Sequence, residues 1–367
     1  MTGQDEPVPV PIAGILLLCA LYVCSSDAGC GSAPEADDDT GSASDGQGDA
    51  PDADHASGCT QDPSWELMPS GTREYLYDVW GSATDDVFAV GRQGTILHFD
   101  GADWRPMESG TTRELAAVWG SGPRDVWAVG EDDIRLHFDG VGWSEEGRVP
   151  EPAMGENLWG IWGAAADDVW SVGECCGGGY GLVMHFDGAD WMTVGRAWTC
   201  GDLADIFGVA GGEVFTVGGY SSCDETAIFR LDGDRWSAVG PHRELWADSL
   251  TAVWTDSDGS GWAVGMHGVV CLRDGLDWSC GETGETRGYH GVWGLRSDDV
   301  FVVGDDGTIR HWDGSTILEW ASPTRFRLTD VWGVGEDVVF ATGFGGTTAD
   351  SPILRLCWDR PDGPWHP

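Results

Sequence analysis

The stretch from Leu115 to Trp143 reads LAAVWGSGPRDVWAVGEDDIRLHFDGVGW, and it decides the fold. Short apolar runs alternate in it with polar turns. The same order occurs from Leu76 to Trp104, as LYDVWGSATDDVFAVGRQGTILHFDGADW. Weaker copies begin at Leu158, Leu203, Leu250, Tyr289 and Leu328. The glycines that end the second run of each copy lie 39 to 47 residues apart. A period near 40 residues made of short apolar runs is typical of propeller blades.

Each copy predicts four strands. The first is the run that ends in V-W-G, and the second is the nearly continuous apolar run DVWAVG. Such a run is typical of a strand that is covered on both faces. The third strand, RLHF in this copy, ends at Asp139-Gly140, and Asp-Gly is a strong hairpin signal because glycine adopts the positive φ of the turn. The fourth strand begins at Trp143, and no helix signal is found in the repeats.

The two ends of the repeat region predict how the ring closes. The segment WELMPSGT, from Trp65 to Thr72, matches the fourth strand WRPMESGT that begins at Trp104. The seventh copy ends after its third strand, at Leu356. We therefore expect an all-β, seven-bladed β-propeller of four-stranded antiparallel blades over residues 64–367, in which the N-terminal strand completes the last blade. Closure of this kind removes exposed sheet edges.

The residues before the propeller predict export. Ile12 to Cys24 is an apolar run that is short for a membrane span and suits the core of a secretory signal, so residues 1–30 are expected to be a signal. The small residues before Cys30 suggest that Cys30 is lipidated, with Cys24 as the alternative. Residues 31–63 are rich in acids and predict a disordered tether. A plain secreted protein or a short uncleaved anchor is the other interpretation.

The charge of the chain argues against several partners. Its 62 acidic residues face 19 basic ones, all arginine, which gives a formal net charge of −43. A field this negative repels nucleic-acid phosphates and anionic lipids. We therefore expect no nucleic-acid partner and membrane contact only through a lipid anchor. We expect the mature protein to be a monomer. It should lie in the cell envelope, as an outer-membrane lipoprotein, or be secreted.

The repeats resemble those of known propeller families. The run GWAVG from Gly261 to Gly265 and the run DGADW from Asp100 to Trp104 are similar to units of photosystem II assembly factors and of Asp-box, sialidase-like propellers. The Asp-box loop itself is not intact in any copy. The DVWAVG repeats also resemble those of exported lipoproteins of myxobacteria. The resemblance implies the propeller fold and leaves the activity open.

Eight cysteines stand outside any shared repeat position and are expected to form disulfides in an exported chain. They are Cys59, Cys175, Cys176, Cys200, Cys223, Cys271, Cys280 and Cys357. Cys271 and Cys280 flank a hairpin turn, so they should face each other. Cys59 and Cys357 should lock the ring closure. The other four converge at one corner, as disulfides or as a four-thiolate zinc site.

Residues that recur at one position in the blades are expected to be structural. The histidines of the third strand, His98, His137, His185 and His311, should pack and hydrogen-bond between blades. The pairs Asp85-Asp86, Asp167-Asp168 and Asp298-Asp299 should bond to the backbone of their own turns. Asp256 and Asp258 alternate as calcium ligands do, although a plain acidic turn is the alternative. The sequence thus predicts no catalytic residue and no metal site beyond these options.

Arginine and aromatic residues gather in the loops that should open on one end of the ring. The predicted ligand-binding residues are Arg73, Tyr75, Arg92, Arg113, His267, Arg287, Tyr289, His290, Arg325 and Arg327. Arginine forks and aromatic planes recognise carboxylates, sugars and peptides. The alternative is that these arginines only offset an acidic rim.

Three functions fit this pattern. The first is a non-catalytic, surface-anchored binding module for a protein or glycan partner. The second is a sialidase-like glycoside hydrolase or lyase, in which Tyr75 or Tyr289 would act with Glu74 or Glu114. The third is a structural assembly factor, as the resemblance suggests. The repeat contains no constellation that singles out catalytic residues.

Overall fold

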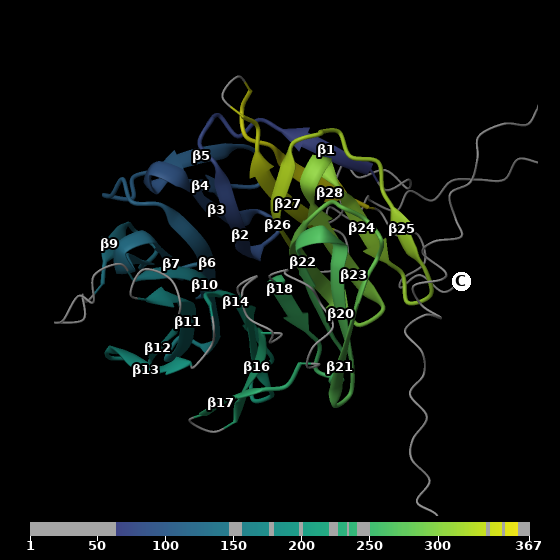
Figure 1. Cartoon of the computed structure of the whole chain (residues 1–367). Coiled ribbons are helices and arrows are strands. Elements are labelled where there is room, and N and C mark those ends of the chain that lie inside the picture. The colour runs from purple at the N-terminus through teal and green to yellow at the C-terminus, as the bar shows by residue number, and fades with distance from the viewer. Residues whose placement is uncertain are drawn as a thin grey trace, which may run out of the picture.

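The computed structural model describes most of the chain from residue 64 onward. The described ranges are 64–146, 156–175, 180–197, 201–219, 227–232, 235–240, 250–334, 338–346 and 349–358. Within them the chain forms seven antiparallel sheets of four strands each, arranged as blades around one axis (Figure 1). The predicted seven-bladed propeller is therefore confirmed.

Blades 1 to 4 follow the chain in order, and each is a simple meander. Blade 1 consists of β2 (Leu76–Ala83), β3 (Asp86–Gly91), β4 (Ile96–Phe99) and β5 (Trp104–Met107). Blade 2 consists of β6 (Leu115–Gly122), β7 (Asp125–Gly130), β8 (Arg135–Phe138) and β9 (Trp143–Glu145). Blade 3 consists of β10 (Asn157–Ala165), β11 (Asp168–Cys175), β12 (Tyr180–Phe186) and β13 (Trp191–Ala197). Blade 4 consists of β14 (Leu203–Gly208), β15 (Val214–Gly218), β16 (Ala227–Asp232) and β17 (Arg235–Ala238).

Blades 5 and 6 repeat the meander, and blade 7 takes one strand from the N-terminal side. Blade 5 consists of β18 (Leu250–Thr255), β19 (Gly261–Gly265), β20 (Val269–Asp274) and β21 (Asp277–Glu282). Blade 6 consists of β22 (Tyr289–Arg296), β23 (Asp299–Gly304), β24 (Ile309–Trp312) and β25 (Ile317–Glu319). Blade 7 consists of β26 (Arg327–Val334), β27 (Val338–Phe344), β28 (Ile353–Cys357) and β1 (Ser64–Met68).

The helical segments among the described residues are short turns between the second and third strands. They are η1 (Arg92–Gly94), η2 (Glu131–Asp133), η3 (Met266–Gly268) and η4 (Asp305–Gly307). None of them is long or apolar enough to cross a membrane.

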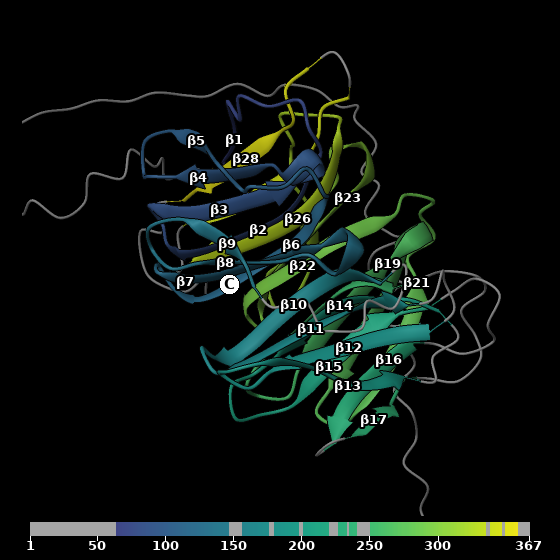
Figure 2. The same cartoon turned by 90° about the vertical axis from the view of Figure 1, so that its left-hand side faces the viewer.

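The ring closes where the sequence predicts. β1 pairs antiparallel with β28, from Ser64 opposite Cys357 to Met68 opposite Ile353. Figure 1 shows the purple β1 beside the yellow β28, and Figure 2 shows the same pair from the side. The predicted N-terminal closing strand is confirmed.

Tryptophans of the fourth strands fill the gaps between blades. At six of the seven interfaces in the described chain, such a tryptophan meets the second-strand aromatic of the preceding blade edge to face, with ring centroids 5.3–6.2 Å apart. The pairs are Trp104 with Phe340, Trp143 with Phe88, Trp191 with Trp127, Trp236 with Trp170, Trp278 with Phe215 and Trp65 with Phe301. Edge-to-face pairs of large rings stabilise beyond their buried area. At the interface of blades 5 and 6, Ile317 stands at this strand position, opposite Trp312.

The glycine that ends each second strand allows two strands to approach closely. A Cβ placed on Gly91 would lie 1.9 Å from the carbonyl oxygen of Tyr75, and one on Gly130 would lie 2.0 Å from that of Glu114. Both glycines have extended backbones, so the reason is space and not a left-handed conformation. Gly173, Gly218, Gly304 and Gly343 repeat this contact at 1.9–2.2 Å. The recurring V-G of the sequence therefore has a packing origin.

The recurring histidines join the second and third strands of blades 1, 2, 3 and 6 near the Asp-Gly turns. Nε2 of His98 lies 2.7 Å from Asp86, and the imidazole ring packs on Phe88. His137, His185 and His311 do the same with Asp125, Asp168 and Asp299, at 2.6–2.7 Å. The histidines thus pack and hydrogen-bond within their own blades, whereas the sequence predicted these contacts between blades. The Asp-Asp pairs were predicted to bond to the backbone of their own turns. In the structure the second aspartate of each pair contacts a histidine of the third strand instead.

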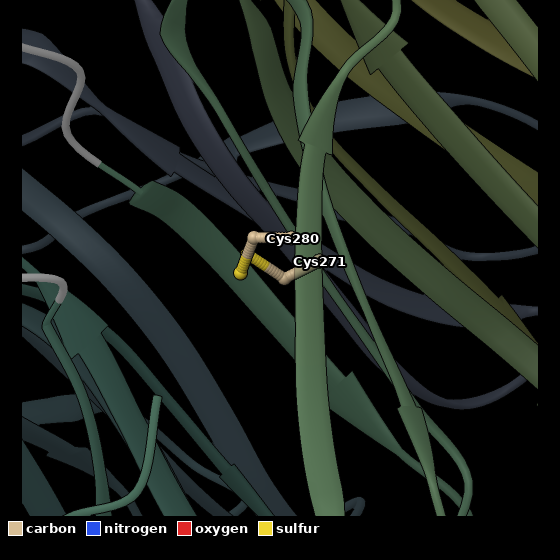
Figure 3. Close-up of a disulfide and its surroundings, with 2 residues drawn as sticks. All are labelled: Cys271 and Cys280. Carbon is tan, nitrogen blue, oxygen red and sulfur yellow. A yellow bond between two sulfur atoms is a disulfide. The ribbon is translucent and has the colours of Figure 1, made fainter. Parts of the chain in front are cut away.

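The hairpin between blade 5's third and fourth strands carries a disulfide. Cys271 and Cys280 are opposite each other on β20 and β21 and are joined, as predicted (Figure 3). Cys175 is buried in the core between blades 2 and 3. Cys59, Cys176, Cys200 and Cys223 lie outside the described residues, as does the side chain of Cys357. The ring-closing disulfide and the choice between disulfides and zinc at the corner stay predictions.

Candidate binding surface

The links between blades and the loops between second and third strands meet at one end of the ring. The amide of Arg92 donates to the carbonyl of Tyr75 at 2.8 Å, and the amide of Glu131 donates to that of Glu114 at 3.0 Å. We call this end the loop face, and the opposite end, with the Asp-Gly turns, the hairpin face. The described residues among the ten predicted for ligand binding belong to these links and loops or to the strand starts beside them.

An aromatic cluster lies on the loop face over blades 1 and 7. The ring of Tyr75 stacks on Phe344 with centroids 3.3 Å apart, and the ring of Tyr77 lies nearly parallel to that of Tyr75 with centroids 6.1 Å apart. The guanidinium of Arg92 is 5.6 Å from the centre of the Tyr75 ring, within cation–π range. We call Tyr75, Tyr77, Phe344 and Arg92 the aromatic cluster.

Glu114 anchors this cluster from the next blade. It forms an ion pair with Arg92 at 3.2 Å and accepts a hydrogen bond from the Tyr77 hydroxyl at 3.1 Å. Burial, followed by the charge of Glu114, raises the pKa of Tyr77, so its hydroxyl stays protonated and remains a donor. The cluster thus presents flat rings together with one paired cation. Tyr77 and Phe344 were not among the predicted residues.

A second polar group joins blades 6 and 7. His290 lies 3.0 Å from Asp305, and Arg327 donates to the same carboxylate at 2.7 Å. Burial lowers the pKa of His290, so at neutral pH the imidazole is uncharged. For Asp305, burial raises the pKa, but the hydrogen bonds from His290 and Gly288 outweigh it and the net shift is downward. The charged pair here is therefore Arg327 with Asp305.

Three of the other four predicted arginines also lie beside carboxylates. Arg113 pairs with Glu145 at 2.8 Å, and Arg73 lies 3.8 Å from Asp350. Arg287 lies between Glu285 and Glu319. Such pairs agree with the alternative that the arginines offset an acidic rim. The assignment of these residues to a ligand stays a prediction.

The remaining predicted residues differ in exposure. His267 is exposed at the tip of η3, with φ of +55°, and Arg325 is exposed on the link to blade 7. Tyr289 is 1% exposed and lies between blades 5 and 6. Tyr289 therefore belongs to the interior of an interface, unlike the other nine.

Three aspartates that the sequence interpretation missed connect the innermost strands. Asp78 accepts hydrogen bonds from the amides of Val79 and Val118, at 2.7 Å each, and so joins blades 1 and 2. Asp205 joins blades 4 and 5 through the amides of Ile206 and Val253, at 2.8 Å each. Asp330 accepts from Val79 across the closure of the ring. The sequence did mark these aspartates. In each first strand one residue precedes the V-W, I-W or I-F pair, and from blade 1 to blade 7 it is Asp, Ala, Gly, Asp, Ala, Gly and Asp.

Burial governs the protonation of these carboxylates. It raises the pKa of Asp205 to about 7, and it raises the pKa of Asp78 and of Asp330, which lie beside each other. For an acid whose pKa is higher in the folded state, the contribution to stability is fully present below the unfolded value, about 3.9, and is lost as pH rises through the folded value. The window for Asp205 therefore runs from about pH 4 to pH 7.

We expect Asp205→Ala to flatten the pH dependence of stability. Ala117 and Ala252 stand at the same position in blades 2 and 5, so alanine fits there. Between pH 5 and pH 8 the free energy of unfolding of the wild type should fall by about 2 kcal/mol more than that of the variant. The figure is smaller than for a fully buried acid, because Asp205 keeps some exposure. Urea unfolding at both pH values measures this difference. Asp100→Ala is the control, because hydrogen bonds from its turn lower the pKa of Asp100 and place its effect at acid pH. Equal slopes for wild type and Asp205→Ala would contradict the assignment.

The acidic turn of blade 5 is held by hydrogen bonds within the turn and to the neighbouring turn of blade 6. Asp258 accepts from the amide of Ser260 at 2.7 Å, and Asp256 accepts from the amide of Ser297 at 2.8 Å. In the part of the chain that the structure describes, no three His, Cys, Asp or Glu side chains are grouped to hold a metal ion. Calcium binding at Asp256 and Asp258 stays a prediction.

Comparison with known proteins adds evidence on the fold. No family model and no curated protein sequence matches the chain. Among solved structures, YCF48 bound to D1 peptide is similar, with a TM-score of 0.63, 18% identity, and coverage of 80% of this chain and 97% of that chain. YCF48 from Cyanidioschyzon merolae has a TM-score of 0.61 and 16% identity, over 80% of this chain and 98% of that chain. The WD40 propeller domain of Doa1 has a TM-score of 0.59 and 16% identity, over 82% and 99%. At these identities the likeness establishes the propeller architecture alone.

Proposed function

We propose that this chain is an exported, lipid-anchored and non-catalytic propeller that binds a segment of a partner protein on its loop face. The observation that carries the proposal is the aromatic cluster. Tyr75 and Phe344 offer a stacked apolar surface, and Arg92 beside them offers guanidinium donors. A peptide presents apolar side chains and backbone carbonyls together, which this combination matches.

The fold comparison supports a protein partner. One structure of the same architecture is that of a propeller bound to a peptide. An assembly factor would use the same chemistry, because it also holds a segment of another protein. The signal, the tether at residues 31–63 and the lipidated cysteine rest on the sequence, and they would place the loop face at the cell surface.

Site-specific photocrosslinking in the native cell envelope tests the proposal. A benzophenone amino acid replaces Thr112, which is exposed on the loop face, or Asp103, which is exposed on the hairpin face. We expect a discrete protein adduct from position 112 and none from position 103. The double variant Tyr75→Ala with Arg92→Ala should reduce the adduct at least tenfold, while Arg105→Ala on the outer strand of blade 1 should leave it unchanged. Equal adducts from both faces, or an adduct that the double variant does not affect, would contradict the proposal.

A further inference from the structure

The outer wall of the propeller has a groove between blades 6 and 7, which we call the outer groove. Its volume is about 510 Å³. Ser64 and Trp65 of β1 form one wall, and residues 319–323, which end β25 and begin the link to blade 7, form the other. Ser64, Ala321 and Pro323 are exposed, so the groove is open to solvent. Ligand clefts commonly have about 300–1,000 Å³, so the outer groove has room for a large side chain.

Two tryptophans give the outer groove an apolar lining. Trp65 and Trp320 both pack edge to face on Phe301, with ring centroids 6.1 and 5.6 Å apart. Leu67 follows Trp65 by two residues, and Leu318 precedes Trp320 by two. Side chains two residues apart along a strand point to the same side, so these leucines extend the apolar lining. They are 55% and 45% exposed, and open apolar surface beside a groove is typical of a contact site.

The described chain leaves blade 7 beside the outer groove. Trp358, directly after β28, is buried, and its ring centroid lies 5.7 Å from that of Trp320. Cys357 before it is opposite Ser64 in the pairing of β28 with β1. Residues 359–367, which lie outside the described residues, therefore follow a tryptophan that already touches the groove wall. The seven residues after Trp358 span at most about 24 Å, which is enough chain to turn back into the groove.

The sequence of residues 359–367, DRPDGPWHP, repeats the turn signal of the blades. In blades 1 to 5 the third strand is followed by Asp-Gly and, three residues after the glycine, by the tryptophan that begins the fourth strand. Here Asp362-Gly363 is followed by Trp365, one residue earlier. Blade 7 already has β1 as its fourth strand, with Trp65 at this position. The second turn signal and its tryptophan therefore have no place inside the blade.

We propose that residues 359–367 turn back along the outside of blade 7 and bind in the outer groove, with the indole of Trp365 against Trp320 and Trp65. An indole supplies flat apolar area to a lining of tryptophan and leucine, and its N–H finds acceptors in the Ser64 hydroxyl and the Glu319 carboxylate at the groove wall. Prolines on both sides of Trp365 restrict the backbone and lower the entropy that binding costs.

The bound segment would connect β28, β1 and blade 6 from outside. It would thus reinforce the seam at which β1 closes the ring. The proposal concerns the outer wall and not the loop face, so it is independent of the proposed function.

Photocrosslinking within the purified full chain tests the proposal. A benzophenone amino acid replaces Trp365, and tryptic digestion with mass spectrometry identifies the residue to which it becomes joined. We expect an intramolecular crosslink to residues 64–68 or 318–323. The same amino acid at Leu276, which is 80% exposed on the hairpin face of blade 5, should give no crosslink to these residues. A crosslink from position 365 to another surface or to a second copy, or no crosslink, would overturn the proposal.

A charge in the outer groove should displace the segment. Ala321→Glu adds a carboxylate beside Glu319 and the apolar lining, and it should reduce the crosslink from position 365 at least fivefold. Ala102→Glu is the matched control in the Asp-Gly turn of blade 1 and should leave the crosslink unchanged. Both alanines are exposed, so neither substitution enters the core. An unchanged crosslink in Ala321→Glu would place Trp365 elsewhere and overturn the proposal.

Hydrogen exchange provides a measurement without benzophenone. In a chain that ends at residue 359, the amides of residues 318–323 should exchange at least fivefold faster than in the full chain, and Trp365→Ala should have the same effect. His366→Ala is the control and should exchange like the full chain. Equal exchange in all four chains would overturn the proposal, because a bound segment must protect the groove. The loop-face adduct from position 112 should not change in the shortened chain, so each proposal fails separately.

Discussion

Removing β1 will destabilise the propeller more than any single substitution considered for this chain. A chain that begins at residue 70 loses the fourth strand of blade 7, five residue pairs with β28 and the ring of Trp65 against Phe301. β28 then becomes an open edge, which favours pairing with other chains. We expect the midpoint of thermal unfolding to fall by more than about 10 °C. We also expect the truncated chain to form soluble aggregates below that midpoint, while it is still folded.

The control for this truncation is a chain that begins at residue 57, which keeps β1 and Cys59. It should unfold like the full chain, because the predicted signal and most of the tether precede it. Trp65→Ala in the full chain separates the side chain from the strand, and it should cost about 3–5 kcal/mol, as large aromatic truncations in cores do. Calorimetry and size-exclusion chromatography provide the measurements. Equal midpoints for the chains that begin at 57 and 70 would show that β1 does not close the ring.

Gly130→Ala is expected to lower the free energy of unfolding by about 3 kcal/mol or more. The new methyl group would lie 2.0 Å from the carbonyl oxygen of Glu114, which is backbone and cannot rotate away. The strands must separate, which weakens the 3.0 Å hydrogen bond from the Glu131 amide to that carbonyl. Forced overpacking of this kind commonly costs about 1–3 kcal/mol, and the weakened hydrogen bond adds to it.

Gly122→Ala is the matched control in the same blade. Nothing lies within 4 Å of a Cβ at Gly122, so the substitution should change the free energy of unfolding by less than about 0.5 kcal/mol. Urea denaturation of the two variants and the wild type measures both effects. A result in which the two variants lose the same stability would mean that the close approach at Gly130 is not what the recurring glycine serves.

The repeat made most of the fold predictable from the sequence. Period, strand order and turns are local properties, since apolar runs and Asp-Gly turns act within a few residues. The match between WELMPSGT and WRPMESGT then identified β1 as the missing strand of blade 7. The pair Cys271 and Cys280 was predictable for the same reason, because a hairpin places residues symmetric about its turn opposite each other.

The candidate site was less predictable, because its residues meet across blades. Asp78 bonds to Val118, 40 residues away, and no pattern within one repeat shows that contact. Tyr289 was expected on the loop face with the other nine residues, yet it lies inside the interface of blades 5 and 6 because it takes the place of a core leucine. The arginines lie on the loop face as expected, but their carboxylate partners come from links, loops and outer strands and were not foreseen.

The sequence by itself determined the number of blades, the strand order and the closing strand, because each follows from short-range periodicity repeated seven times. Only the tertiary structure decided which side chains of different blades meet. It brought together the residues of the aromatic cluster, and it placed Asp78, Asp205 and Asp330 where each bonds to a neighbouring blade. The physical reason is that an interface between blades depends on the pairing of two repeats, and the pattern of one repeat carries no information about its neighbour's side chains.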